Sequence, residues 1–221
     1  ASKAAMRQAF REAGPAHLTP DEMVSAWAMA FREFSREVKN TEWYGTYLRE
    51  GGLTRTEQMR RTLGVLGIED EAMAQRLSQC YHQFRQANLK LFPEALGVLK
   101  ALHGRYPMGL ITNGPADIQR EEIAVCEIGS FFEHVLIEGE MLMGKPSPEV
   151  FAKAEQLSGC KPHELLFVGN SYGHDIVPAI DAGWFTAWIR RPSDVAPSRD
   201  GEGKPEEKPD DGRQPTMEIC S

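Results

Sequence analysis

The sequence predicts an α/β fold in which a parallel β-sheet core follows an all-helical domain. Two patterns predict it. Up to about residue 90, apolar residues recur at the three- and four-residue spacing of amphipathic helices, and no convincing strand is present. After that point, short apolar runs alternate with helical segments, which is typical of βαβ units in a parallel sheet. With 221 residues, 41% of them hydrophobic, the chain is long enough for one such core and a smaller domain.

Residues 1–90 are expected to form four or five helical segments. The clearest begins at Thr19, whose hydroxyl can cap a helix that starts with proline and two acidic residues and carries Trp27 on an apolar stripe. A Gly-Gly pair at residue 51 indicates a break, and the next helix is expected over residues 54–66. A helical bundle of this size is predicted to need a partner surface for stability.

Four strands are expected after residue 91, at residues 108–111, 135–137, 165–168 and 185–189. The third lies in LLFVGNSYGHDIVPAIDAGW, where four apolar residues without a polar face indicate a strand buried on both sides. Gly169 ends that strand, and Asn170 and Asp175 follow it. Open α/β sheets bind ligands at this end of their strands. Asp175 near a helix start could equally be a helix cap, so this stretch alone leaves both interpretations open.

Polar residues also follow the first two of these strands. Thr112 and Asn113 end the first, and Lys145 lies in the loop after the second. Because parallel strands bring such ends to one edge of the sheet, a hydroxyl and main-chain N–H groups could bind a phosphoryl oxygen there. Lys145 could neutralise the same group, and the Asp175 carboxylate could hold a divalent cation. The alternatives are a common Thr-Asn-Gly turn and a solvated lysine.

Three motifs in order, ITNG, GKPSPEVF and FVGNSYGHDIVPAIDAG, resemble the second, third and fourth motifs of the haloacid dehalogenase-like (HAD) hydrolases. The chain is most similar to the subgroup with a helical cap, which includes phosphoglycolate phosphatase-like enzymes and 2-haloacid dehalogenases. The resemblance implies a cap over residues 1–90 and a Rossmann-like core over residues 91–191.

The same resemblance implies roles for individual residues. Thr112, with Asn113, would bind the phosphoryl group, and Lys145 would stabilise the nucleophile and the phosphate. Asp175 and Asn170 would help to hold Mg²⁺. Asn170 stands where most members of the family carry an acid, and an amide oxygen contributes no charge, so the affinity for Mg²⁺ is expected to be lower.

The first motif of the family, DxDxT, has no counterpart, since the chain contains no Asp-x-Asp. The family's nucleophile is the first aspartate of that motif. The chain is therefore expected to be an inactive fragment whose central first strand is missing, so that the strands on either side stay apart or pair directly. The acidic segment 192–221, rich in proline and glycine, is expected to be disordered, with the start of a truncated edge strand at Met217.

The resemblance implies a Mg²⁺-dependent phosphatase of a small phosphorylated metabolite that acts through a phosphoaspartate. One alternative is a 2-haloacid dehalogenase, which the five-residue separation of Asn170 and Asp175 disfavours. The other is a catalytically dead binding module. Aromatic and arginine residues at 43–55, including Tyr44, Tyr47 and Arg55, are either a substrate loop or bundle core with solvated charges.

The composition of the chain disfavours some classes of binding partner and predicts a cellular compartment. The formal net charge of −7 disfavours binding to nucleic acid or to an anionic membrane surface. No apolar run approaches the roughly 18 residues of a membrane span. The four cysteines are scattered without metal-ligand spacing, which indicates reduced thiols and predicts a cytoplasmic protein. The sequence does not predict the oligomeric state.

Overall fold

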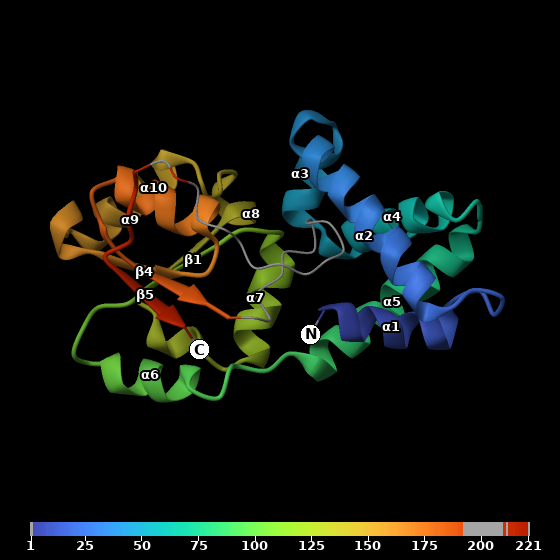
Figure 1. The fold of residues 1–221 in the computed structure, drawn as a ribbon, viewed down its shortest axis with the longest axis horizontal. Coiled ribbons are helices and arrows are strands. Elements are labelled where there is room, and N and C mark those ends of the chain that lie inside the picture. The colour runs from blue at the N-terminus through green and yellow to red at the C-terminus, as the bar shows by residue number, and fades with distance from the viewer. Residues whose placement is uncertain (1, 192–209, 211, 221) are drawn as a thin grey trace. The chain divides into compact units, whose positions relative to one another are not determined.

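The computed structural model describes residues 2–191, 210 and 212–220, which fall into two compact units (Figure 1). The first unit comprises Ala1–Arg105 and Pro115–Phe131, and the second comprises Tyr106–Gly114 and Phe132–Ser221. Within the described residues the first unit is helical, and the second holds the strands. The predicted disorder of residues 192–209 lies outside the described residues.

The helices of the first unit begin and end as follows: α1 Ser2–Ala13, α2 Pro20–Glu37, η1 Val38–Asn40, α3 Trp43–Arg49, α4 Gly51–Val65, α5 Glu71–Asn88, α6 Ala95–Leu102, α7 Ala116–Val125 and η2 Gly129–Phe131. Helix α2 starts with the predicted cap, because Thr19 Oγ1 accepts a hydrogen bond from Glu22 N and the Glu22 carboxylate accepts one from Thr19 N. Helices α1, α2, α4 and α5 pack on one another and bury a shared core that includes Met6, Phe10 and Trp27.

Helix α4 begins three residues before the predicted start at residue 54, and this is a correction to the sequence interpretation. The Gly51 N–H donates to the Asp117 carboxylate at 2.9 and 3.1 Å, so a side chain 66 positions away caps the helix. A Cβ at residue 51 would lie 2.2 Å from Ile118 Cγ1. Glycine therefore allows a close approach here and does not break the helix.

The elements of the second unit are β1 Gly109–Thr112, β2 His134–Ile137, α8 Glu138–Met141, α9 Pro148–Ser158, η3 Pro162–Glu164, β3 Leu166–Gly169, η4 Tyr172–Ile176, α10 Val177–Asp181, β4 Phe185–Arg190 and β5 Met217–Cys220. The strands form two parallel sheets, β1-β2 and β3-β4-β5. Strands β1 and β3 do not pair with each other, which is the first of the two outcomes expected for these strands. Strand β5 lies where the sequence predicts an edge strand.

The two faces of the sheet β3-β4-β5 differ in burial. One face carries Phe167, which packs with Phe151 of α9 and Trp184 in a buried aromatic cluster. On the other face, Leu166 is 51% and Val168 is 53% exposed. The prediction that this strand is buried on both sides is therefore wrong, because about half of each of these two residues is exposed.

No helix in the described ranges combines the length and the apolar character that crossing a membrane requires.

Candidate active site

The predicted site residues lie in the second unit. Thr112 and Asn113 are at the carboxyl end of β1, Lys145 lies in the loop between α8 and α9, and Asn170 and Asp175 follow β3. Thr112 is the last residue of β1, and the side chain of Asn113 after it makes two hydrogen bonds to the main chain of Lys145. Asn113 Nδ2 donates to Lys145 O at 2.7 Å, and Lys145 N donates to Asn113 Oδ1 at 2.8 Å. The Asn113 carboxamide therefore ties two loops together, which leaves its main chain, and not its amide group, as the part that can meet a phosphoryl group.

The ammonium group of Lys145 donates to Asp175 Oδ1 at 2.6 Å. Both side chains are largely buried, with exposed fractions of 12% for Lys145 and 7% for Asp175. Lys145 Nζ also lies 5.3 Å from the centre of the Phe167 ring, where the face of the ring attracts a cation. A lysine in this setting is a fixed positive charge and not the solvated side chain of the alternative interpretation.

The second oxygen of Asp175 organises the loop after β3. Asp175 Oδ2 accepts hydrogen bonds from the main-chain N–H groups of Asn170 at 3.1 Å and Ser171 at 3.0 Å. The carbonyl oxygen of Asn170 accepts a bond from Trp188 Nε1 at 3.1 Å. A Cβ at residue 169 would lie 2.5 Å from Asp175 Cβ, so Gly169 leaves room for this carboxylate. The structure thus joins Asn113, Lys145 and Asp175 into one hydrogen-bonded network.

The predicted magnesium ligands, Asn170 and Asp175, do not make a complete site by themselves. Mg²⁺ takes about six oxygen ligands in near-octahedral geometry. Both oxygens of Asp175 are already engaged, and the Asn170 side chain is exposed. Within the part of the chain that the structure describes, no group of three or more His, Cys, Asp or Glu residues could hold a metal ion. The assignment of these two residues to Mg²⁺ therefore stays a prediction.

Sequence reasoning missed Glu138, which follows β2 directly. Its side chain is 1% exposed, and Glu138 Oε2 accepts a hydrogen bond from Gly114 N at 3.0 Å. This glutamate lies outside the three motifs ITNG, GKPSPEVF and FVGNSYGHDIVPAIDAG. Its position immediately after a predicted strand, at the same edge of the sheet as Thr112, is the signal that could have found it.

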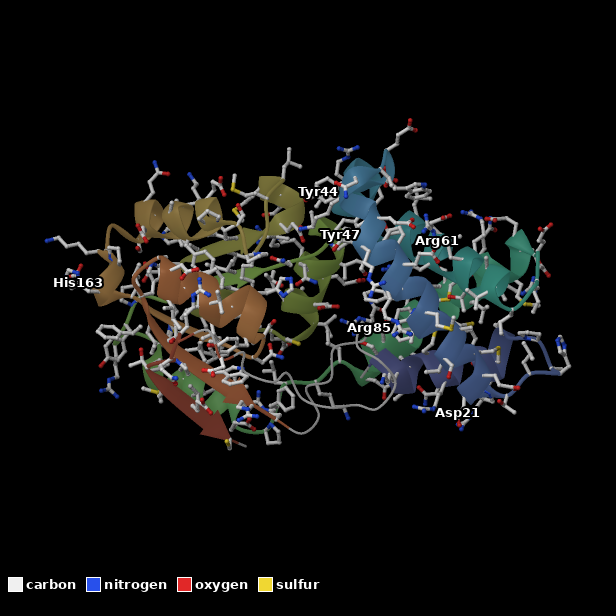
Figure 2. All side chains as sticks on the ribbon, turned by 45° about the horizontal axis from the view of Figure 1, so that its top comes forward. Asp21, Tyr44, Tyr47, Arg61, Arg85 and His163 are labelled. Atoms are coloured by element: carbon white, nitrogen blue, oxygen red, sulfur yellow. The ribbon has the colours of Figure 1, made fainter. Side chains whose placement is uncertain are left out.

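The aromatic and arginine residues of α3 and α4 belong to the first unit. Tyr44 and Tyr47 stack on each other along α3, and Arg61 lies over the ring of Phe34, which in turn contacts Tyr47 (Figure 2). Arg55 is half-buried, and its Nε has no hydrogen-bond partner among the described residues. Burial lowers the pKa of Arg55, although the nearby carboxylates of Asp117 and Glu121 oppose that shift. Tyr44 and Tyr47 are partly buried and pack on each other and on the buried Phe34, and Arg55 is itself partly buried.

A comparison with known families decides the classification. The profile of the haloacid dehalogenase-like hydrolases matches residues 2–189 of the chain. The chain belongs to this family. Its membership agrees with the three motifs that carry the site, in ITNG, GKPSPEVF and FVGNSYGHDIVPAIDAG.

Individual relatives within the family are distant. The chain is 34% identical over 125 residues to a glyceraldehyde 3-phosphate phosphatase of Methanopyrus kandleri, which covers 55% of this chain and 54% of the relative. The HAD hydrolase YfnB of Bacillus subtilis, solved with bound magnesium, is 23% identical with a TM-score of 0.67, covering 99% of this chain and 86% of that one. The L-2-haloacid dehalogenase of Xanthobacter autotrophicus is 26% identical with a TM-score of 0.61, covering 86% of this chain and 72% of that one. The chain spans about half the length of the curated relatives that it matches.

Proposed function

We propose that this chain is part of an enzyme that removes the phosphoryl group from a small phosphorylated metabolite. The observation that carries the proposal is the buried network in which Asp175 holds the Lys145 ammonium group and Asn113 holds the Lys145 main chain. A buried cation on a loop whose main chain is tied to Asn113 suits a phosphoryl group, whose oxygens carry the charge that has to be stabilised. The similarity to a glyceraldehyde 3-phosphate phosphatase supports the same substrate class.

In the proposed reaction, an aspartate attacks phosphorus, the alcohol leaves, and water then hydrolyses the phosphoaspartate. Thr112 would bind a phosphoryl oxygen through its hydroxyl, and Lys145 would neutralise charge that builds up on the group. Because these 221 residues contain no Asp-x-Asp, we propose that they do not include the nucleophile and do not turn over substrate by themselves.

We also propose that the reaction depends on Mg²⁺, with Asn170 and Asp175 as the ligands from this chain. The support comes from the three family motifs and from the magnesium-bound relative YfnB. The described residues supply too few ligands for a complete site, so no step of the reaction is assigned to the metal.

A 2-haloacid dehalogenase is the second candidate, and the similarity to the Xanthobacter autotrophicus enzyme is the observation that favours it. The five-residue separation of Asn170 and Asp175 disfavours a dehalogenase. A binding module without catalysis is the remaining candidate, and the absence of the first motif from these 221 residues is what motivates it.

The decisive experiment is to recover the codons upstream of Ala1 and to compare the extended protein with the 221-residue chain. We expect the extended protein to carry DxDxT and to release phosphate from small phosphate esters only with Mg²⁺. Lys145→Ala should lower its turnover by about 100-fold or more, as the loss of a transition-state contact does. We expect the 221-residue chain to show no turnover.

Other outcomes contradict the proposal in different ways. Release of halide from 2-chloropropionate without metal would identify a dehalogenase instead. An extended protein that binds phosphate esters but hydrolyses neither substrate would indicate a binding module. Mg²⁺-dependent turnover by the 221-residue chain would refute the proposal that it lacks the nucleophile.

A further inference from the structure

We propose that Glu138 is a positioning residue, which holds the loop Thr112–Gly114 in the shape that binds the phosphoryl group. This inference rests on the proposed function, because it assigns a task within the same site. Glu138 is not among the residues that would touch the substrate, so its effect would pass through the main chain of the loop.

The first observation is that Glu138 and its neighbour hold both polar groups of Gly114. Glu138 Oε2 accepts a hydrogen bond from Gly114 N at 3.0 Å, and Gly139 N donates to Gly114 O at 3.0 Å. Gly114 has a φ of +127°, a conformation that residues with a side chain rarely adopt. The turn after Thr112 is therefore held in an unusual shape by two bonds from the start of α8.

The second observation is that Gly144 makes room for this arrangement. A Cβ at residue 144 would lie 2.6 Å from Glu138 Cδ and 2.9 Å from Asn113 Oδ1. The Glu138 carboxylate and the Asn113 carboxamide thus lie side by side over the main chain of Gly144. Since Asn113 in turn binds the main chain of Lys145, Glu138 is linked to both the phosphate-binding turn and the lysine loop.

The third observation is the burial of Glu138. Removing a carboxylate from water is costly, and an apolar side chain of similar size would fill an ordinary core position at lower cost. Glu138 is only 1% exposed, so its hydrogen bonds have to offset the cost of burying the carboxylate. One of these bonds is made at the turn that follows Thr112, where Gly114 N donates to Glu138 Oε2.

Two substitutions of Glu138 distinguish a positioning role from a simple packing role. Glu138→Gln keeps an oxygen that can accept the Gly114 N–H bond and removes a negative charge close to the anion site. Glu138→Ala removes the acceptor and leaves the buried N–H without its partner. We therefore expect Glu138→Gln to bind orthophosphate at least as tightly as the unchanged protein, and Glu138→Ala to bind it more weakly.

The test uses nuclear magnetic resonance on the ¹⁵N-labelled 221-residue chain, with two readouts. Hydrogen exchange of the Gly114 amide measures the hold on the turn, and titration with orthophosphate, followed at the Thr112 and Asn113 amides, measures anion binding. In Glu138→Ala we expect both the Gly114 exchange rate and the phosphate dissociation constant to rise by about tenfold. Glu138→Gln should keep the Gly114 exchange rate within about threefold of that of the unchanged chain, and should bind phosphate at least as tightly.

Glu155→Ala is the matched control, because the Glu155 carboxylate accepts a hydrogen bond from Trp184 Nε1 at 2.7 Å elsewhere in the same unit. It should leave both readouts unchanged. Gly144→Ala is a second variant for the case that Glu138→Ala fails to fold. Its Cβ should displace the Glu138 carboxylate and speed Gly114 exchange in the same way.

Several results would overturn the inference. They are an unchanged Gly114 exchange rate in Glu138→Ala, an equal change in Glu155→Ala, or a loosened turn that binds phosphate as before. If the unchanged chain binds no orthophosphate, with or without Mg²⁺, the proposed function fails for this chain. Gly114 exchange would still decide whether Glu138 holds the turn.

Discussion

The helical bundle α1–α5 and the sheet β3-β4-β5 differ in how completely they bury their apolar side chains. In the bundle, Met6, Phe10 and Trp27 are almost fully buried within one shared core. In the sheet, strand register places a set of half-exposed apolar side chains on one face: Leu166, Val168, Phe185, Met217 and Ile219. The opposite face of β3 and β4 is packed by α9 and α10 (Figure 1).

This difference has a physical reason. Amphipathic helices that pack on one another bury their apolar stripes against stripes of the same kind, so a bundle closes around its own core. A parallel sheet has two apolar faces and needs a separate layer on each. The apolar run 165–168 therefore predicts a strand correctly, but whether both of its faces are buried depends on elements elsewhere.

The largest expected effect contrasts the bundle core with the open face of the sheet. Phe10→Ala should lower the free energy of unfolding by about 3–5 kcal/mol, because it leaves a cavity in a packed core. Phe185→Ala should lower it by less than about 1 kcal/mol, because half of this side chain already meets water. Urea-induced unfolding measures both values. Equal losses in the two variants would mean that the sheet face is covered in solution.

A smaller effect contrasts a buried with an exposed ion pair. Asp175→Asn should lower the free energy of unfolding by about 3 kcal/mol, because it leaves the Lys145 charge buried without its partner. Adding Lys145→Met should recover most of this loss. In the bundle, Arg7 pairs with the exposed Asp21, labelled in Figure 2, and Asp21→Asn should cost at most about 1 kcal/mol.

The double-mutant cycle at residues 145 and 175 checks this prediction, again by urea unfolding. If the double variant is no more stable than Asp175→Asn alone, the loss comes from the main-chain bonds of Asp175 in the loop after β3, and not from the unpaired lysine.

The smallest effect compares two neighbouring glycines at the start of α4. Gly51→Ala should cost about 1–3 kcal/mol, because its Cβ would lie 2.2 Å from Ile118 Cγ1. In Gly52→Ala the added Cβ would meet only Arg55 Nη2, at 4.0 Å. This substitution should stabilise the helix by up to about 1 kcal/mol. Melting temperatures of the two variants should therefore move in opposite directions. A shared direction would contradict the close approach of Ile118.

Part of the candidate site could be predicted from the sequence. Thr112, Asn113, Lys145 and Asp175 follow strands of a parallel sheet, whose carboxyl ends share one edge. The structure joins the last three in one hydrogen-bonded network, and their roles stay predictions. Their hydrogen-bond partners could not be predicted in the same way. That the Asn113 amide binds the main chain of Lys145, 32 residues later, depends on how two loops meet in space. The hydrogen bond between Gly114 N and the Glu138 carboxylate involves no sequence motif and could not be predicted either.

The sequence by itself determined the apolar stripes of the helices, the alternation of strands and helices, and the polar residues at the strand ends. These features depend on neighbours within a few positions along the chain. Only the tertiary structure decided that α4 starts at Gly51, that one face of β3 is half-exposed, and that Glu138 accepts a hydrogen bond from Gly114 N. The physical reason is that such features depend on contacts between residues far apart along the chain. The hydrogen bonds at Gly51 and Gly114 join residues 66 and 24 positions apart, and no local sequence pattern records them.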